Sequence, residues 1–241
     1  MSLRARRAKQ SPHSQGAAGT AGIIRIMKHP IFDHFYKIGV IPVLELVSAH
    51  HARPLAESLL AGGLPIAEVT LRTDAALESI RVIAREVPEV TVGAGTVINR
   101  QQAQAACDAG AQFLVTPGMV EEVVAWAQEN KVPILAGAVT PTEMIRGIQL
   151  GLDILKFFPA ETVGGLKAIK ALSDPFPQLR FIPTGGVKLE NLAEYLQMEK
   201  IHAVGGSWMA KRQMIAEGRF DEITRLAKEA STLVRLIRES I

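Results

Sequence analysis

The sequence has little cysteine, few aromatic residues and no long hydrophobic run. Cys107 is the single cysteine among 241 residues, which excludes an internal disulfide framework and is typical of a reducing compartment. No apolar run reaches the roughly 18 residues that a membrane-spanning helix needs. Aromatic residues make up only 5% of the chain, and they are not interleaved with a basic stripe of the kind that binds nucleic acid. We therefore expect a cytoplasmic protein without a membrane or nucleic-acid partner.

Acidic residues are missing from the first 28 positions. Six of the 27 Lys and Arg residues lie there, so the rest of the chain has 21 basic residues against 24 acidic ones and is mildly acidic. The N-terminal stretch is rich in Arg, Ser, Gly and Ala, has no periodicity, and lacks the apolar segment of a secretory signal. We expect residues 1–26 to be a disordered or poorly ordered extension, with an organelle transit peptide as the alternative. Residues 27–241 are expected to form one domain.

Nucleotide-binding motifs are missing as well. The segment GAGTVIN at 93–99 has the first two glycines of a dinucleotide fingerprint but not the third, and there is no Walker A loop. A doubly wound open sheet is therefore only the alternative among the α/β folds.

Instead, the chain has eight short β-branched apolar runs that alternate with helical patterns. These runs are residues 39–46, 66–71, 90–97, 112–118, 132–139, 153–159, 180–186 and 202–208. Strands that are apolar on both faces predict a parallel sheet covered by helices, and eight strand–helix units predict a (β/α)8 TIM barrel. The segment 29–39 is expected to be a helix that caps the barrel before the first strand. In TPTE at 140–143, Thr140 and Glu143 predict a helix that begins with a capping box.

One lysine, Lys156, lies inside the otherwise apolar run DILKFFP. Burial disfavours the charged form of an amine, and a neutral amine attacks ketones and aldehydes. With a carboxylate as proton shuttle this describes Schiff-base catalysis, and a structural ion pair is the alternative. Glu68 is the candidate carboxylate, because Glu68, Thr70 and Arg72 are expected on one side of a strand. Glu68 can pair with either Arg72 or Lys156.

Polar residues also end several other expected strands, at the end where barrel enzymes carry their active sites. The polar residues are Thr96, Thr116, Thr140, Thr184 and Ser207, and they are accompanied by Pro117, Gly185, Gly186, Gly205 and Gly206. The diglycine segments allow backbone N–H groups to approach an anion, and Ser207 adds a hydroxyl donor, so a phosphate group is expected here. The six histidines show no metal-ligand spacing. No metal or other cofactor is expected.

Together, these motifs resemble the class I 2-keto-3-deoxy-6-phosphogluconate (KDPG) aldolases, a family that includes 4-hydroxy-2-oxoglutarate (KHG) aldolase activity. The resemblance covers roughly residues 39–230 and rests on EVTLRT, VGAGTV, TPG, KFFPAE, PTGG and GGSW, in this order. It implies a homotrimer of single barrels. It further implies cleavage of KDPG to pyruvate and glyceraldehyde 3-phosphate, and of KHG to pyruvate and glyoxylate. The alternatives are an aldolase for the 6-phosphogalactonate epimer and a non-catalytic phosphosugar-binding barrel.

The resemblance also implies roles for individual residues. Lys156 matches the Schiff-base lysine of the family and Glu68 matches its acid/base glutamate. The implied substrate-binding residues are Arg72 and Thr96 for the carboxylate, Pro117 and Phe158 for the pyruvate pocket, Thr184 for the hydroxyls, and Gly185, Gly186, Gly206 and Ser207 for the phosphate. Glu45 departs from the family pattern, because an aliphatic residue is usual there. We expect it to be peripheral or structural, with an effect on the aldehyde half of the substrate as the alternative.

Overall fold

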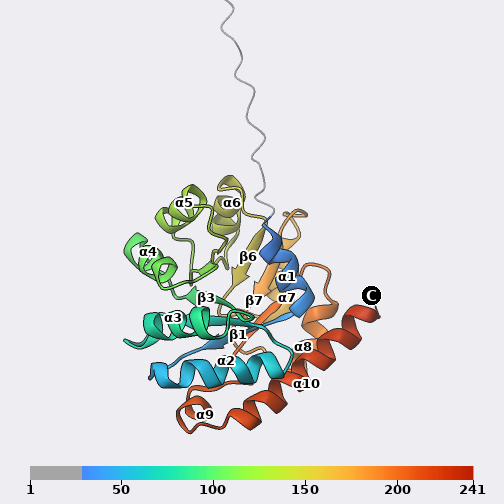
Figure 1. Cartoon of the computed structure of the whole chain (residues 1–241). Helices are drawn as coiled ribbons and strands as arrows, with labels where there is room; N and C mark the ends of the chain where they lie inside the picture. Colours follow the sequence, from blue (N-terminus) through green and yellow to red (C-terminus); the bar gives the residue numbers. More distant parts are fainter. Residues whose placement is uncertain (1–28, 241) are drawn as a thin grey trace, which may run out of the picture.

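The computed structural model describes residues 29–240, and the N-terminal extension expected at residues 1–26 lies outside them. Eight short strands alternate with helices along this part of the chain (Figure 1). The strands are β1 (Val40–Leu44), β2 (Ile66–Thr70), β3 (Thr91–Gly95), β4 (Leu114–Val115), β5 (Ile134–Leu135), β6 (Ile154–Phe157), β7 (Arg180–Pro183) and β8 (Val204–Gly206). Each of the eight apolar runs contains one of them, so the predicted strand positions are confirmed.

The strands form two parallel sheets. Six of them are ordered β5-β4-β3-β2-β1-β8, and β6 and β7 form a separate pair. Isolated parallel bridges link the two sheets at both ends of the pair, between Gly137 and Lys156 and between Thr184 and Gly205. The α/β class with a parallel sheet is therefore confirmed.

Helices cover the outside of the sheets and connect successive strands (Figure 1). They are α1 (Pro30–Ile38), η1 (Ala49–His51), α2 (Ala52–Ala61), α3 (Ala76–Glu86), α4 (Arg100–Asp108), α5 (Glu121–Glu129), α6 (Pro141–Gln149), α7 (Gly165–Ser173), α8 (Leu189–Gln197), α9 (Arg212–Ala216) and α10 (Phe220–Glu239). The predicted capping box is present at the start of α6, where Thr140 accepts from Glu143 N and Glu143 accepts from Thr140 N. The last helix, α10, runs along α2 and is tied to it by Ser231, whose hydroxyl donates to Gly62 O at 2.7 Å.

Apolar side chains pack in two layers. The larger cluster fills the space between strands and helices, and the smaller one lies on the other side of the strands. The smaller cluster consists of Ile31, Phe35, Ile41, Ile66, Phe113, Val115, Leu135, Ile154, Ile182 and Ala203. Phe35 of α1 contacts Phe113 edge-on, with ring centroids 5.0 Å apart. The predicted helix at 29–39 is thus present as α1, and it packs against the amino ends of the strands.

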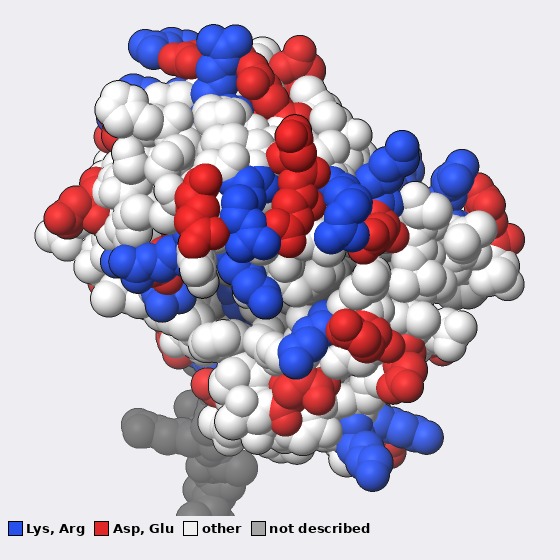
Figure 2. Space-filling view, turned by 90° about the horizontal axis from the view of Figure 1, so that it is seen from below, with Lys and Arg blue, Asp and Glu red and all other residues white. Residues whose placement is uncertain are grey.

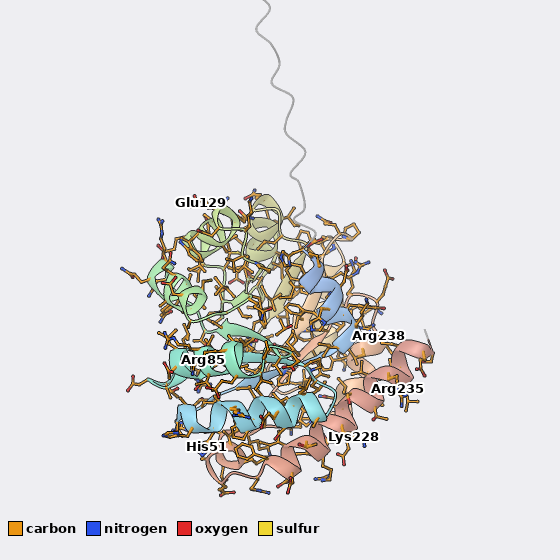
Figure 3. The ribbon with its side chains drawn as sticks, viewed as in Figure 1. His51, Arg85, Glu129, Lys228, Arg235 and Arg238 are labelled. Carbon is orange, nitrogen blue, oxygen red and sulfur yellow. The ribbon has the colours of Figure 1, made fainter. Side chains whose placement is uncertain are left out.

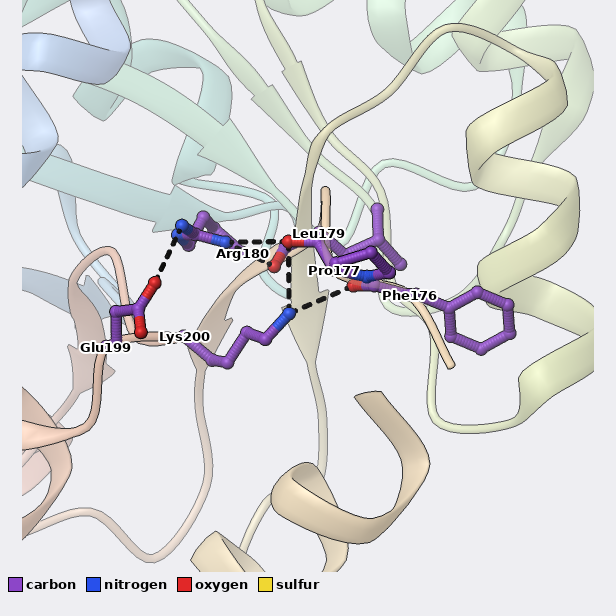
Figure 4. A network of polar contacts seen from close by, with 6 residues as sticks. All are labelled: Phe176, Pro177, Leu179, Arg180, Glu199 and Lys200. Carbon is purple, nitrogen blue, oxygen red and sulfur yellow. Dashed lines mark hydrogen bonds and ion pairs between the residues drawn. The ribbon is translucent and has the colours of Figure 1, made fainter. Parts of the chain in front are cut away.

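Polar contacts tie the connecting segments together at this same end. Lys200 Nζ donates to the carbonyl oxygens of Phe176 and Pro177, at 3.0 and 3.1 Å, and Arg180 pairs with Glu199 (Figure 4). These contacts join the segment before β7 to the segment before β8. They stabilise the amino ends of the two strands. A cavity of about 740 Å³ opens beside them, between α7 and these connecting segments, and no strand residue lines it.

Charged side chains cover the outer helices. Acidic and basic residues alternate over the face seen in Figure 2, which shows no broad patch of one sign. Lys228, Arg235 and Arg238 follow one another along α10 (Figure 3). Among residues 29–240, no helix combines the length and the apolar character needed to cross a membrane.

Candidate active site

The centre of the site is a buried ion pair between β6 and β2. Lys156 is 5% exposed and Glu68 is 2% exposed, and Lys156 Nζ lies 3.0 Å from Glu68 Oε1. Of the two partners that the sequence allowed for Glu68, the structure has Lys156. The two residues are 88 positions apart in the chain, so only the folded sheet brings them together.

Strand periodicity explains why both side chains point the same way. Ile66 and Ile154 belong to the smaller apolar cluster, and Glu68 and Lys156 follow them by two residues on β2 and β6. Because side chains alternate along a strand, each charged residue shares the face of the apolar residue before it. The apolar cluster therefore lies toward the amino ends of the strands, and the ion pair lies toward their carboxyl ends.

Gly95 makes room for the Glu68 carboxylate. It ends β3, the neighbour of β2, and a Cβ at this position would overlap Glu68 Oε1. The segment GAG belongs to the incomplete dinucleotide fingerprint and to the family motif VGAGTV, but neither pattern explains Gly95 physically. Its physical role is a close approach of backbone and side chain, which any residue other than glycine would block.

The buried ion pair is expected to add little to folding stability, but its two groups are suited to catalysis. Removing two charges from water carries a desolvation penalty, so an apolar pair of similar volume is often at least as stable. An amine and a carboxylate in contact and away from bulk water can instead add to a carbonyl carbon and pass protons to and from it. Nζ also lies 5.5 Å from the ring centroid of Phe158.

A cavity of about 300 Å³ lies on the other side of Phe158 and Thr70, which line it, whereas Lys156 and Glu68 do not. Seven of the expected substrate-binding residues line it: Arg72, Phe158, Thr184, Gly185, Gly186, Gly206 and Ser207. They come from the ends of β2, β6, β7 and β8, which are scattered along the sequence. This volume lies at the lower end of the range for small-molecule sites, which is about 300–1,000 Å³.

Two expected substrate-binding residues, Thr96 and Pro117, do not line this cavity. Both are half-buried and follow β3 and β4, on the same sheet as Glu68. Thr96 has φ of 60°, in the left-handed region that a β-branched residue rarely adopts. Unusual backbone of this kind clusters at functional sites, so it is a signal at Thr96 that the sequence alone did not carry.

The expected placement of Arg72 on the strand needs a correction. Strand β2 ends at Thr70, and Arg72 lies in the turn that follows, so the alternation along the strand no longer sets its direction. Its side chain is 60% exposed and forms an ion pair with Glu45, with Arg72 Nη2 and Glu45 Oε2 3.0 Å apart. Thr70 is buried, and its hydroxyl donates to Leu44 O at 2.9 Å.

Three charged residues of the cavity were missed or misjudged. Glu45 was expected to be peripheral or structural, but it lines the cavity together with Lys211 and Arg212. Arg212 Nη1 donates to Glu45 Oε1 at 2.6 Å. Neither Lys211 nor Arg212 has a strand or motif around it that would have pointed to the site.

Other candidate reactive groups lie away from this cavity. Burial raises the pKa of the Cys107 thiol to about 11, and the nearby Asp108 charge acts in the same direction. The thiol is therefore protonated at neutral pH and a poor nucleophile. Within the described range, His, Cys, Asp and Glu residues form no cluster of three that could hold a metal ion.

A lysine beside a carboxylate at the carboxyl end of a parallel sheet is typical of enzymes that form imines with carbonyl substrates. The comparisons with known proteins agree with this class. The family model described as KDPG and KHG aldolase matches residues 31–226. The chain is also 46% identical over 191 residues to the KHG/KDPG aldolase of Escherichia coli K12, covering 79% of this chain and 90% of that protein.

Solved structures show the same relationship. The KDPG aldolase of Legionella pneumophila, with pyruvate captured at low pH as a covalent carbinolamine, superposes with a TM-score of 0.80 at 37% identity, covering 83% of this chain and 97% of that one. The KDPG aldolase of Zymomonas mobilis ZM4 with 3-phosphoglycerate gives a TM-score of 0.78 at 42% identity, covering 85% and 96%. The chain therefore belongs to the KDPG and KHG aldolase family.

Proposed function

We propose that the protein is a class I aldolase that cleaves KDPG to pyruvate and glyceraldehyde 3-phosphate, and KHG to pyruvate and glyoxylate. The observation that carries the proposal is the buried contact of 3.0 Å between Lys156 Nζ and Glu68 Oε1, beside a cavity rich in cations. The covalent carbinolamine in the Legionella structure supports a route through a pyruvate–lysine bond.

In the proposed mechanism, Lys156 adds to the C2 ketone of the substrate. One amine proton and one proton delivered by the Glu68 carboxyl group leave with the C2 oxygen as water, which gives an iminium that keeps one N–H and acts as an electron sink. Glu68 serves as the proton shuttle and takes the proton of the C4 hydroxyl as the C3–C4 bond breaks. The electron pair of that bond moves into the iminium and forms an enamine. The aldehyde departs, the enamine is protonated at C3, and water releases pyruvate and the free lysine.

We assign the remaining residues to the two ends of the substrate. Arg72 and Thr96 bind the carboxylate, and Pro117 and Phe158 enclose the pyruvyl group. Thr184 contacts the hydroxyls, and the phosphate lies against the glycine-rich ends of β7 and β8, at Gly185, Gly186, Gly206 and Ser207. A positive φ at Gly185 (96°) and at Gly186 (86°) supports a sharply turned loop that leaves backbone groups open to the cavity.

For the architecture, we propose that the two sheets close into one eight-stranded barrel formed by residues 27–241. The bridges between Gly137 and Lys156 and between Thr184 and Gly205 support closure, as does the smaller apolar cluster. Every strand except β3 and β8 contributes a residue to that cluster, and Ala203 enters it directly before β8. We further propose that the protein acts as a homotrimer in the cytoplasm, with no metal or cofactor.

The test is reduction with borohydride in the presence of pyruvate, followed by intact-mass and peptide mass spectrometry. We expect a pyruvate-derived adduct on Lys156 in the wild-type protein and none in Lys156→Ala. The same variant should lose cleavage of KDPG altogether. A folded wild-type protein that forms no adduct would contradict the proposal and favour a phosphosugar-binding role. A panel with KDPG, KHG and the 6-phosphogalactonate epimer then identifies the aldehyde half.

A further inference from the structure

Glu45 joins two arginines at the mouth of the substrate cavity. Its carboxylate accepts from Arg212 Nη1 at 2.6 Å and lies 3.0 Å from Arg72 Nη2. The Glu45 side chain is only 16% exposed, whereas those of Arg72 and Arg212 are 60% and 62% exposed. The carboxylate is therefore the shielded member of the group, and the guanidinium groups are open to an incoming ligand.

The charges that line the cavity are strongly unbalanced. Arg72, Lys211 and Arg212 are cationic, and Glu45 is the single acid among the described lining residues. An adjoining cavity of about 750 Å³ has no such excess, because three acids, Glu190, Glu222 and Glu229, accompany the cations Lys188, Lys211 and Arg219. The positive excess thus belongs to the smaller cavity beside Lys156, and it favours a ligand with more than one negative charge.

The two arginines approach this cavity from different sides. Arg72 follows β2, beside Thr70. Arg212 comes five positions after Ser207 and begins α9, the helix that follows the glycine-rich end of β8. Arg212 is therefore the arginine on the β8 side of the cavity, where the phosphate group is placed. Glu45 follows β1, which lies between β2 and β8 in the sheet.

We propose that Arg212 is a specificity-determining residue that binds the distal anionic group of the substrate, and that Glu45 is the positioning residue that holds it at the cavity. The proposal rests on the aldolase function proposed above and names a residue that discriminates between its substrates. A phosphate oxygen accepts from the Arg212 guanidinium alongside the Ser207 hydroxyl. Because Glu45 already restrains the long arginine side chain, less side-chain freedom is lost when the ligand binds.

A purely structural role accounts poorly for this arrangement. Exposed ion pairs contribute little to folding stability, and salt screens them. The exposed pair of Arg53 and Glu57 on α2 has the same chemistry, with a contact of 2.8 Å, and lines none of the described cavities near the site. Arg53 is therefore a matched control for Arg212.

The experiment compares kcat/KM for KDPG and for unphosphorylated 2-keto-3-deoxygluconate. For Arg212→Met we expect kcat/KM to fall roughly tenfold with KDPG, mainly through a higher KM, and to change less than about twofold with the unphosphorylated substrate. Arg212→Lys keeps the charge and should recover part of the loss, and Arg53→Met should leave both substrates unchanged. An equal loss on both substrates, or no loss on KDPG, would overturn the proposal.

The role of Glu45 is tested by Glu45→Gln in the wild-type and Arg212→Met backgrounds. We expect it to change the ratio of kcat/KM between the two substrates in the first background and to leave that ratio unchanged in the second. An equal change in both backgrounds would contradict positioning of Arg212 by Glu45.

The pyruvate adduct separates this proposal from the aldolase proposal. Pyruvate has no distal anionic group, so Arg212→Met should form the adduct on Lys156 as the wild-type protein does. Absence of the adduct in the wild-type protein contradicts the aldolase function. A normal adduct with an unchanged substrate ratio contradicts the role of Arg212 alone.

Discussion

The two ends of the parallel strands use polar side chains in opposite ways. At the carboxyl ends, Glu68 and Lys156 pair with each other beside a cavity of about 300 Å³. At the amino ends, the cavity between α1 and the starts of β5 and β6 holds only about 20 Å³. There, His202 Nε2 donates to Phe32 O at 2.7 Å, and Arg238 Nη2 donates to His202 O at 2.9 Å.

The polar groups at the two ends therefore have different roles: those at the carboxyl ends belong to the candidate active site, and those at the amino ends stabilise the fold. Backbone carbonyls at the amino ends accept the hydrogen bonds of the polar side chains, and α1 covers the apolar cluster, so these groups stabilise the fold. At the carboxyl ends, the glycines leave space, and the charged groups form contact ion pairs beside that space. A charged residue near a strand end thus indicates a functional site only where a cavity lies next to it.

The largest expected effect that tests the comparison comes from Glu68→Gln. The amide keeps the shape of the side chain but cannot shuttle protons, so we expect KDPG cleavage to fall by about 10²–10⁴-fold. Steady-state kinetics measure the loss, and circular dichroism checks the fold. Glu57→Gln, which alters an exposed pair on α2, is the control. Cleavage within tenfold of the wild-type rate would make Glu68 a structural counterion.

Ser207→Ala tests the phosphate end of the cavity. Loss of a hydroxyl donor to an exposed phosphate oxygen should lower kcat/KM for KDPG roughly tenfold and spare 2-keto-3-deoxygluconate. Ser207→Thr retains the hydroxyl and should behave like the wild-type protein. If both substrates suffer equally, the glycine-rich ends of β7 and β8 do not bind phosphate.

Arg238→Met tests the amino end. The guanidinium lies 3.7 Å from the centroid of the Tyr36 ring and donates to His202 O, so its removal should lower the free energy of unfolding by about 1 kcal/mol. Chemical denaturation measures this, and kcat should not change. Arg235→Met, an exposed neighbour on α10, is the matched control (Figure 3). A fall in kcat without a fall in stability would contradict the claim that polar groups at the amino ends of the strands act only on folding.

The smallest expected effect is the pH dependence of His202. Burial lowers the pKa of His202, and the hydrogen bond to Phe32 O opposes this more weakly. The unfolded chain therefore binds the proton more readily, so stability is lost as the pH falls from about 6.5 toward the folded pKa, by less than about 1 kcal/mol.

Thermal unfolding at pH 7 and pH 5.5 measures this difference. His202→Gln should have a smaller drop in Tm than the wild-type protein, whereas His50→Gln, at an exposed position, should match the wild-type protein. Identical drops in all three proteins would show that His202 is not coupled to folding.

Local pattern carried most of the fold and the centre of the site. Short β-branched apolar runs located all eight strands, and alternation along β2 placed Glu68 and Thr70 on one side of it. A lysine within an apolar strand stands out because burying a charged amine costs free energy unless the amine is paired or neutral. These features depend on residues close together in the chain, which is why the sequence was enough to predict them.

The rest depended on tertiary structure. The sequence left two cations, Arg72 and Lys156, as partners of Glu68, and only the structure selects Lys156. Likewise, Glu45 lies 167 positions from its partner Arg212. Strand β2 ends two residues before Arg72, so the turn that follows, and not the alternation along the strand, decides where the Arg72 side chain points. Local sequence therefore sets which residues form the strands and which polar groups end them. Curvature and register of the sheet decided which of these groups meet, because no local pattern specifies the distance between residues on different strands.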